Sequence, residues 1–89
     1  MFEWDEKKRQ SNIEKHGIDF VRAKEMWLGT VIEVPSPQTN HGEARFMAIG
    51  AVSDICITVI YTWRGSNKRL ISARRARNYE RENYYDAVR

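Results

Sequence analysis

The stretch ARFMAIGAVSDICITVIYTW, residues 44–63, decides the fold. Its two halves, 44–52 and 55–63, are rich in β-branched and aromatic residues, which favour strands. Only Ser53 and Asp54 separate these halves, so the stretch predicts a β-hairpin. Because both halves are almost continuously apolar, we expect them to be central strands of a sheet that helices cover on one face.

Two helices are predicted on the N-terminal side of the hairpin. Residues 2–4 favour a short extended start, and Asp5 can cap a helix over 6–16. Gly17 can end that helix in the left-handed conformation. Asp19 can cap a second helix, whose apolar residues recur at helical spacing and predict one buried stripe: Phe20, Ala23, Trp27 and Leu28.

The other segments predict two more strands and a last helix. Residues 30–34 favour a strand, and the sequence PSPQTNHGE at 35–43 breaks it, with a turn at Asn40 to Gly42. Residues 68–73 favour the last strand, and Ser72 can cap a closing helix from about Ala73.

This order of elements is typical of an α+β domain. It predicts a mainly antiparallel β-sheet with two N-terminal helices and one C-terminal helix. A chain of 89 residues fits a single domain, which we expect to span 1–89.

The composition favours a soluble, folded protein. The chain is 42% hydrophobic and 30% charged and has only seven Gly and Pro residues, which argues against long disordered segments. No apolar run approaches the roughly 20 residues of a membrane span, and the charged N-terminus is unlike a signal peptide. The lone Cys56 has no partner for a disulfide and is expected to be buried. We therefore expect a cytoplasmic protein that needs no membrane.

Positive charge is concentrated in residues 64–77, which hold six Lys and Arg residues and no acid, although the whole chain carries only +3. Such a block is typical of a surface that binds a polyanion, with a merely solvated basic face as the alternative. Arginines in the first turn of the predicted last helix are disfavoured by the helix dipole, so we expect a phosphate or a partner's carboxylate to neutralise them when it binds. In a regular strand Lys68 and Arg69 would point to opposite faces, with Leu70 beside Lys68 and Ala73 beside Arg69.

Spaced signals over nearly the whole chain resemble the BrnT family of bacterial toxins. They are FEWD at 2–5 with Lys8 and Asn12, KHGIDF at 15–20, RFMAIG at 45–50, YTWRG at 61–65, and RLISARRA at 69–76 followed by Glu80 and Tyr84. BrnT proteins are the ribonuclease half of BrnT/BrnA toxin–antitoxin pairs and are similar in fold to RelE-type toxins. In place of Trp63, related sequences often carry an acidic residue.

The resemblance implies a growth-inhibiting endoribonuclease that cleaves RNA without a metal or another cofactor. It also implies a BrnA-type antitoxin with a ribbon-helix-helix domain, a 2:2 complex with it, and contact with operator DNA only through the antitoxin. The alternative is a non-enzymatic basic module that acts as a corepressor within such a complex.

Candidate site residues follow from the chemistry of RNA cleavage, which needs a base, an acid and cations for the phosphoryl oxygens. Arg64, Arg69 and Arg74 are candidates for phosphate stabilisation. Glu80 is a candidate acid or base, or pairs with arginines of its own helix, and His16 is a candidate catalytic residue or a helix-end residue. The residues expected to bind RNA are Lys8, Lys15, Lys68, Arg75, Arg77 and Tyr84.

Overall fold

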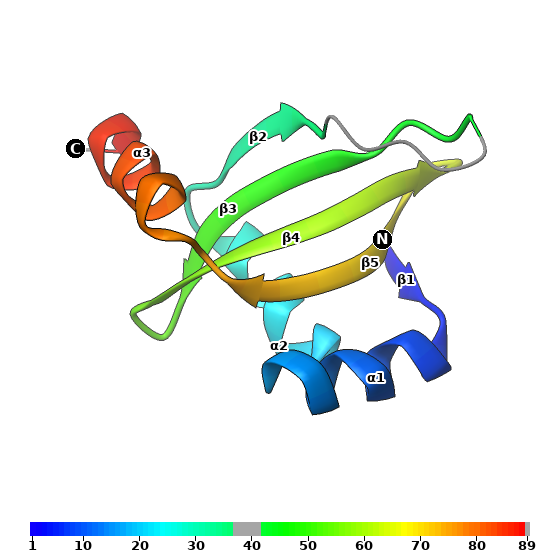
Figure 1. Cartoon of the computed structure of the whole chain (residues 1–89). Coiled ribbons are helices and arrows are strands. Elements are labelled where there is room, and N and C mark those ends of the chain that lie inside the picture. Colours follow the sequence, from blue (N-terminus) through cyan, green and yellow to red (C-terminus); the bar gives the residue numbers. More distant parts are fainter. Residues whose placement is uncertain (37–41, 89) are drawn as a thin grey trace.

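The computed structural model describes residues 1–36 and 42–88 and contains one five-stranded sheet (Figure 1). The strands are β1 (Phe2–Trp4), β2 (Ile32–Pro35), β3 (Phe46–Val52), β4 (Ile55–Arg64) and β5 (Asn67–Arg75). The helices are α1 (Glu6–His16), α2 (Phe20–Ala23), the 3-10 helix η1 (Lys24–Leu28) and α3 (Asn78–Val88). The strand order is β1-β5-β4-β3-β2, and all neighbours are antiparallel except β1 and β5. The predicted α+β class with a mainly antiparallel sheet is confirmed.

The predicted hairpin is formed by β3 and β4, which pair from Phe46 and Tyr61 to Val52 and Ile55. The backbone of Ser53 has φ 48° and that of Asp54 has φ 68°. Two successive positive φ angles are those of a type I′ turn, whose twist matches the right-handed twist of the strands. The turn predicted at Asn40 to Gly42 lies largely outside the described residues.

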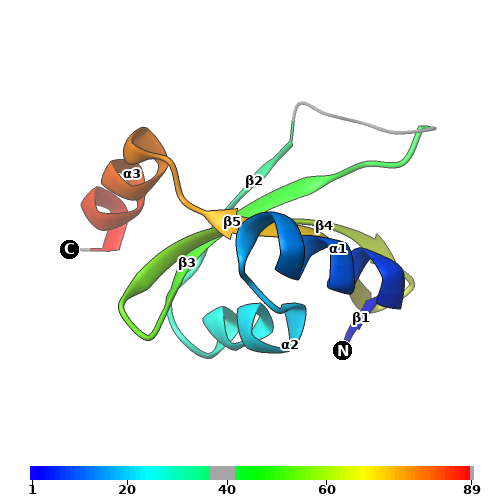
Figure 2. The same cartoon turned by 60° about the horizontal axis from the view of Figure 1, so that its bottom comes forward.

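Helices cover the two faces of the sheet unequally. Helices α1, α2 and η1 lie on one face, the covered face, and α3 lies on the other side of the sheet (Figure 2). The main core fills the covered face and includes Phe20, Met26, Val59, Tyr61 and Leu70. At one end of the opposite face, α3 buries Tyr84 against Ile49 and Cys56, so the prediction that Cys56 is buried is confirmed. None of the helices in the described residues is long and apolar enough to cross a membrane.

The predicted apolar stripe of the second helix is wrong at Leu28, which is 89% exposed. The chain leaves the α-helical conformation after Ala23 and continues as a 3-10 helix with a tighter turn. This change rotates Met26 into the core, where it is fully buried, and turns Leu28 outward.

A β-bulge in β5 changes which side chains share a face. Tyr61 pairs with Leu70 and Ile60 pairs with Ser72, so Ile71 has no residue opposite it. Leu70 and Ala73 therefore both point into the core of the covered face, where they are 1% and 0% exposed. Regular alternation would have put Leu70 and Ala73 on opposite faces, and the bulge interrupts it between them. Lys68 and Arg69 lie before the bulge and point to opposite faces as predicted.

The prediction that the last helix begins near Ala73 is also wrong. Residues Ala73, Arg74 and Arg75 continue β5 and pair with Val59, Thr58 and Ile57 of β4. Helix α3 begins only at Asn78. The long strand β4 supplies pairing partners up to Arg75, so Ser72 caps no helix. Arg74 and Arg75 therefore belong to a strand, and Arg77 lies just before α3.

The outer edge of β5 is completed by a side chain. Strand β1 pairs only with residues 68–70 of β5. Farther along, the Asn12 Nδ2 donates to the Ala73 carbonyl at 2.8 Å, and the Ala73 N–H donates to the Asn12 Oδ1 at 3.0 Å. The same Nδ2 donates to the Ile18 carbonyl at 2.8 Å. Asn12, itself 5% exposed, thus takes the place of a neighbouring strand.

We expect Asn12→Asp to lower the free energy of unfolding by about 2 kcal/mol or more, because a carboxylate cannot donate to the carbonyls of Ile18 and Ala73. The matched control is Asn83→Asp at an exposed position of α3, where we expect a change within about 0.5 kcal/mol. Urea unfolding at pH 7 measures both. If both variants lowered the free energy of unfolding by the same small amount, the role given to Asn12 would be wrong.

Candidate functional site

The candidate site lies on the face of the sheet opposite α1 and α2, the open face. The bulge places Arg69 and Arg74 of β5 on this face, opposite Thr62 and Thr58 of β4. Two hollows lie along it. The Arg74 hollow, of about 340 Å³, is lined by His16, Ile60, Ser72, Arg74, Arg77 and Glu80, among others. The Arg69 hollow, of about 280 Å³, is lined by Lys8, Glu43, Arg45, Thr62, Arg64 and Arg69, among others.

Arg74 is held by a two-pronged ion pair with Glu80. Its Nη1 and Nη2 lie 2.7 Å and 2.9 Å from the two carboxylate oxygens of Glu80. Glu80 also accepts hydrogen bonds from the Thr58 hydroxyl at 3.0 Å and from the backbone N–H of Arg77 at 2.8 Å. Arg74 therefore finds its neutralising carboxylate within the fold, while its side chain stays 21% exposed at the hollow.

The environment of Glu80 fixes its protonation state. Glu80 is 1% exposed, and the Arg74 guanidinium, with the Arg77 N–H and the Thr58 hydroxyl, lowers its pKa to about 2 against the opposing effect of burial. A carboxylate with such a low pKa is a weak base at neutral pH. The arginine that Glu80 pairs with lies on β5, and Arg77 of the helix start contributes only its backbone N–H.

His16 is placed beside Arg74 by the end of α1. Gly17 ends that helix with φ 69° and donates its N–H to the Ile13 carbonyl, so both predicted ends of α1 are confirmed together with the Asp5 cap. The exposed His16 side chain lines the Arg74 hollow. An imidazole is the side chain that most often acts as a general acid or base in enzymes.

The Arg69 hollow holds paired and unpaired cations. The Arg69 Nη1 lies 2.6 Å from Glu3 of β1, and the Arg64 Nε lies 3.2 Å from Glu43. The Arg69 guanidinium lowers the pKa of Glu3. Within the described residues, Lys8 and Arg45 have no ion pair.

Two of the residues expected to bind RNA are not available on the surface of the open face. Lys68 points to the covered face, where its Nζ lies 4.5 Å from the Trp27 ring centre and 3.9 Å from Glu33. Tyr84 is 6% exposed and donates its hydroxyl to the Thr30 carbonyl at 2.8 Å. Both side chains serve packing.

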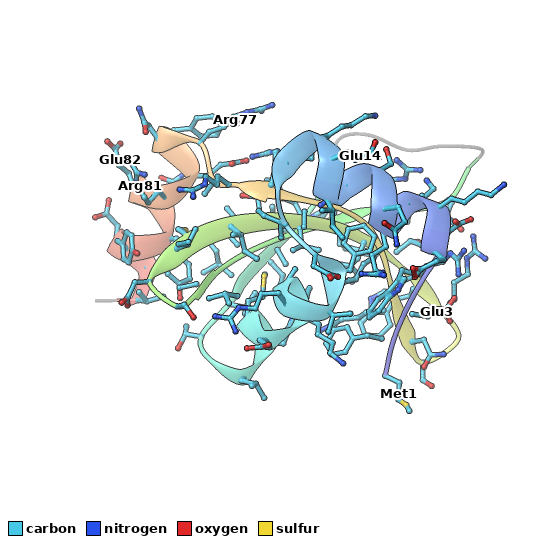
Figure 3. All side chains as sticks on the ribbon, turned by 90° about the horizontal axis from the view of Figure 1, so that it is seen from below. Met1, Glu3, Glu14, Arg77, Arg81 and Glu82 are labelled. Carbon is cyan, nitrogen blue, oxygen red and sulfur yellow. The ribbon has the colours of Figure 1, made fainter. Side chains whose placement is uncertain are left out.

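The other expected RNA-binding residues are exposed at three different places. Lys8 lines the Arg69 hollow, and Lys15 is exposed beside His16 in the last turn of α1. Arg75 points to the covered side, where it lines a separate hollow with Ile18. Arg77 is exposed before α3 and extends away from the ribbon at the Arg74 hollow (Figure 3).

Trp63, where the family resemblance leads us to expect an acidic residue, lines neither hollow of the open face. Its ring packs at right angles on the Tyr61 ring, with 5.9 Å between ring centres, on the covered side of the sheet. A side chain at this position points away from the arginines of the open face.

Sequence reasoning missed Arg45 and Asn12 as site-forming residues. Arg45 stands one residue before β3 and alternates with the inward-facing Phe46, a signal that places it on the open face. The role of Asn12 had no local signal, since its partner is 61 residues away. Across residues 1–36 and 42–88, no group of three or more His, Cys, Asp or Glu side chains is arranged to hold a metal ion.

We expect Glu80→Gln to lower the free energy of unfolding at pH 7 by about 3 kcal/mol, because it breaks a buried ion pair. The pKa of Glu80 is about 2 in the folded chain against an ordinary 4.5, so the carboxylate stabilises the fold above pH 4.5. This contribution is lost as the pH falls toward 2. Urea unfolding of the wild type and of Glu80→Gln should show that the difference between their free energies of unfolding becomes smaller from pH 7 to pH 2.

The control for this change is Glu82→Gln, at an exposed position of the same helix, where we expect a change within about 0.5 kcal/mol. A gap between wild type and Glu80→Gln that stays constant from pH 5 to pH 2 would contradict the assignment.

The chain was compared with known protein families. Residues 4–80 match the family described as "Ribonuclease toxin, BrnT, of type II toxin-antitoxin system". The match runs from the end of β1 to the start of α3 and includes the residues that line both hollows. No curated protein matches the chain.

Proposed function

The chain belongs to the BrnT family of ribonuclease toxins of type II toxin–antitoxin systems, and from this premise we propose that it cleaves RNA on the open face of its sheet. The observation that carries the proposal is the pairing shift at Ile60 and Tyr61. It puts Arg69 and Arg74 on one face, with His16 at the rim of the Arg74 hollow. Cations that converge beside an imidazole are what metal-free phosphodiester cleavage requires.

We assign the reaction to the Arg74 hollow. The His16 imidazole takes the proton of the ribose 2′-OH, whose oxygen then forms a bond to phosphorus while the bond to the 5′ oxygen breaks. Arg74 and Arg77 stabilise the negative charge on the phosphoryl oxygens. The proton returns through solvent to the 5′ oxygen, and the products are a 2′,3′-cyclic phosphate and a 5′-OH. Glu80 acts as a positioning residue, because its carboxylate orients Arg74 and has a pKa near 2.

Several finer features belong to the same proposal. The arginines supply the positive charge that a metal ion supplies in other nucleases, so we propose that the reaction needs no metal. We further propose that residues 1–89 form a single RelE-like toxin domain that acts in the cytoplasm.

A type II toxin has an antitoxin partner. We propose that this partner is a BrnA-type antitoxin with a ribbon-helix-helix domain. It neutralises the toxin in a 2:2 complex, and the complex contacts operator DNA through the antitoxin alone.

The test of cleavage is incubation of the purified chain with labelled RNA in EDTA. We expect cyclic phosphate ends from the wild type and a cleavage rate lower by about 100-fold in His16→Gln, because a general base contributes about that factor or more. Arg74→Lys keeps a cation beside Glu80 but loses the two-pronged geometry, so it should also be slow while remaining folded.

The control is Glu14→Gln, an exposed change on the same helix as His16 (Figure 3), which should cleave as the wild type does. Wild-type protein that binds RNA but leaves it intact in EDTA and in Mg²⁺ would overturn cleavage and favour the non-enzymatic module.

A second experiment compares the contributions of the open face and the covered face to RNA binding. We expect Arg77→Gln to weaken binding to single-stranded RNA and to reduce the slope of log K against log salt by about 0.7. Lys68→Gln should leave this slope unchanged and lower stability, because Lys68 packs over Trp27 on the covered face. Fluorescence anisotropy with a 2′-O-methyl RNA at several salt concentrations measures the slopes. Equal slopes for both variants would contradict an RNA-binding open face.

A further inference from the structure

The Arg69 hollow carries more positive charge than its carboxylates neutralise. Four cations reach it from four segments, namely Lys8 of α1, Arg45 before β3, Arg64 of β4 and Arg69 of β5. The two described carboxylates that pair with them are Glu43 on Arg64 and Glu3 on Arg69. Two positive charges, those of Lys8 and Arg45, are left for a ligand.

Arg45 is the least satisfied of the four cations. Its Nε is buried and, across the described residues, has no hydrogen-bond partner. A buried donor without a partner is costly, and a guanidinium offers donors in a fork that matches the oxygens of a phosphate.

The backbone on both sides of Arg45 is fixed by hydrogen bonds. The Thr62 hydroxyl donates to the Ala44 carbonyl at 2.7 Å, and the Ser36 N–H donates to the Arg45 carbonyl at 2.9 Å. The guanidinium is therefore presented from a rigid strand end, which reduces the entropy lost when it binds a ligand.

The Arg69 hollow is separated from the proposed cleavage position. Arg69 and Arg74 are five residues apart, roughly 15 Å along β5. Their ion pairs draw them apart, to Glu3 on β1 and to Glu80 on α3. The labelled Glu3 and Arg77 lie toward opposite ends of the molecule in Figure 3. One phosphate group cannot engage both hollows.

We propose that the Arg69 hollow is a second phosphate subsite, which holds a further phosphate of the same RNA strand through Arg45 and Lys8 while the scissile phosphate lies at Arg74. This subsite rests on the proposed function, because it presumes that RNA crosses the open face. Arg45 acts in binding and takes no part in the chemical step.

The test uses a 2′-O-methyl RNA hexamer, which cannot be cleaved, and fluorescence anisotropy at several salt concentrations. We expect Arg45→Gln to weaken binding about 10-fold and to reduce the salt slope by about 0.7. Arg45→Lys should keep the slope and lose part of the affinity, because it keeps the charge without the fork. Lys8→Gln should also reduce the salt slope by about 0.7. Because Lys8 is at an exposed helix position, this variant should fold normally and tests the subsite even if the Arg45 variants misfold.

The control is Arg22→Gln, an exposed arginine outside the open face whose side chain pairs with Glu25. It should bind the hexamer as the wild type does. With a cleavable hexamer, Arg45→Gln should raise KM about 10-fold at unchanged kcat. With a dinucleotide that has only the scissile phosphate, it should cleave as the wild type does.

The outcomes separate the subsite from cleavage itself. If wild-type protein cleaves RNA but both Arg45→Gln and Lys8→Gln bind the hexamer normally, the subsite is overturned and the cleavage proposal stands. If no RNA is cleaved but hexamer binding depends on Arg45 and Lys8, the subsite stands and the cleavage proposal fails. If these changes weaken antitoxin binding and spare the hexamer, the hollow binds protein and the subsite is overturned.

Discussion

The pairing of the Asn12 side chain with the backbone of Ala73 is the interaction on which the rest of the structure depends. Strand β1 covers only the first part of β5, and an amide side chain takes over its role farther along. Because Ala73 is satisfied on both sides, the chain remains a strand up to Arg75. Arg74 therefore projects from a rigid sheet, at the point where Glu80 of the following helix can reach it. A helix started at Ala73 would have rotated these two residues apart.

The open face carries two kinds of positive charge: arginines that carboxylates hold in place, and cations that have no carboxylate partner among the described residues. Glu80 fixes the position of Arg74, and Glu3 fixes that of Arg69, so these guanidiniums lose little freedom when an anion arrives. Lys8 and Arg45 bring charge that no carboxylate of the described residues neutralises. Rigid arginines and cations without a carboxylate partner on one sheet face suit a flexible polyanion, because the protein then contributes the order that such a ligand lacks.

The parts of the fold that local chemistry determines could be predicted from the sequence. Asp5, Gly17 and the Ser53–Asp54 turn act through neighbours within a few residues, and each does what its residue type favours. The bulge at Ile71, the end of β5 and the outward turn of Leu28 depend on contacts with distant segments, so periodicity alone placed them wrongly. Arg64, Arg69 and Arg74 were expected to act together, but the bulge that puts Arg69 and Arg74 on one face was not part of that expectation. The charge count over 64–77 could not include Arg45, which reaches the hollow from the segment before β3.

The parallel pairing of β1 with β5 has a consequence for biosynthesis. Glu3 lies opposite Arg69, so β5 inserts between the first strand of the chain and the central hairpin. The hairpin can form early because its strands are adjacent in sequence, but the sheet stays open until residues 67–75 have left the ribosome. Both hollows contain side chains of β5, so an unfinished chain has neither of them. The two hollows therefore form only after β5 has joined the sheet.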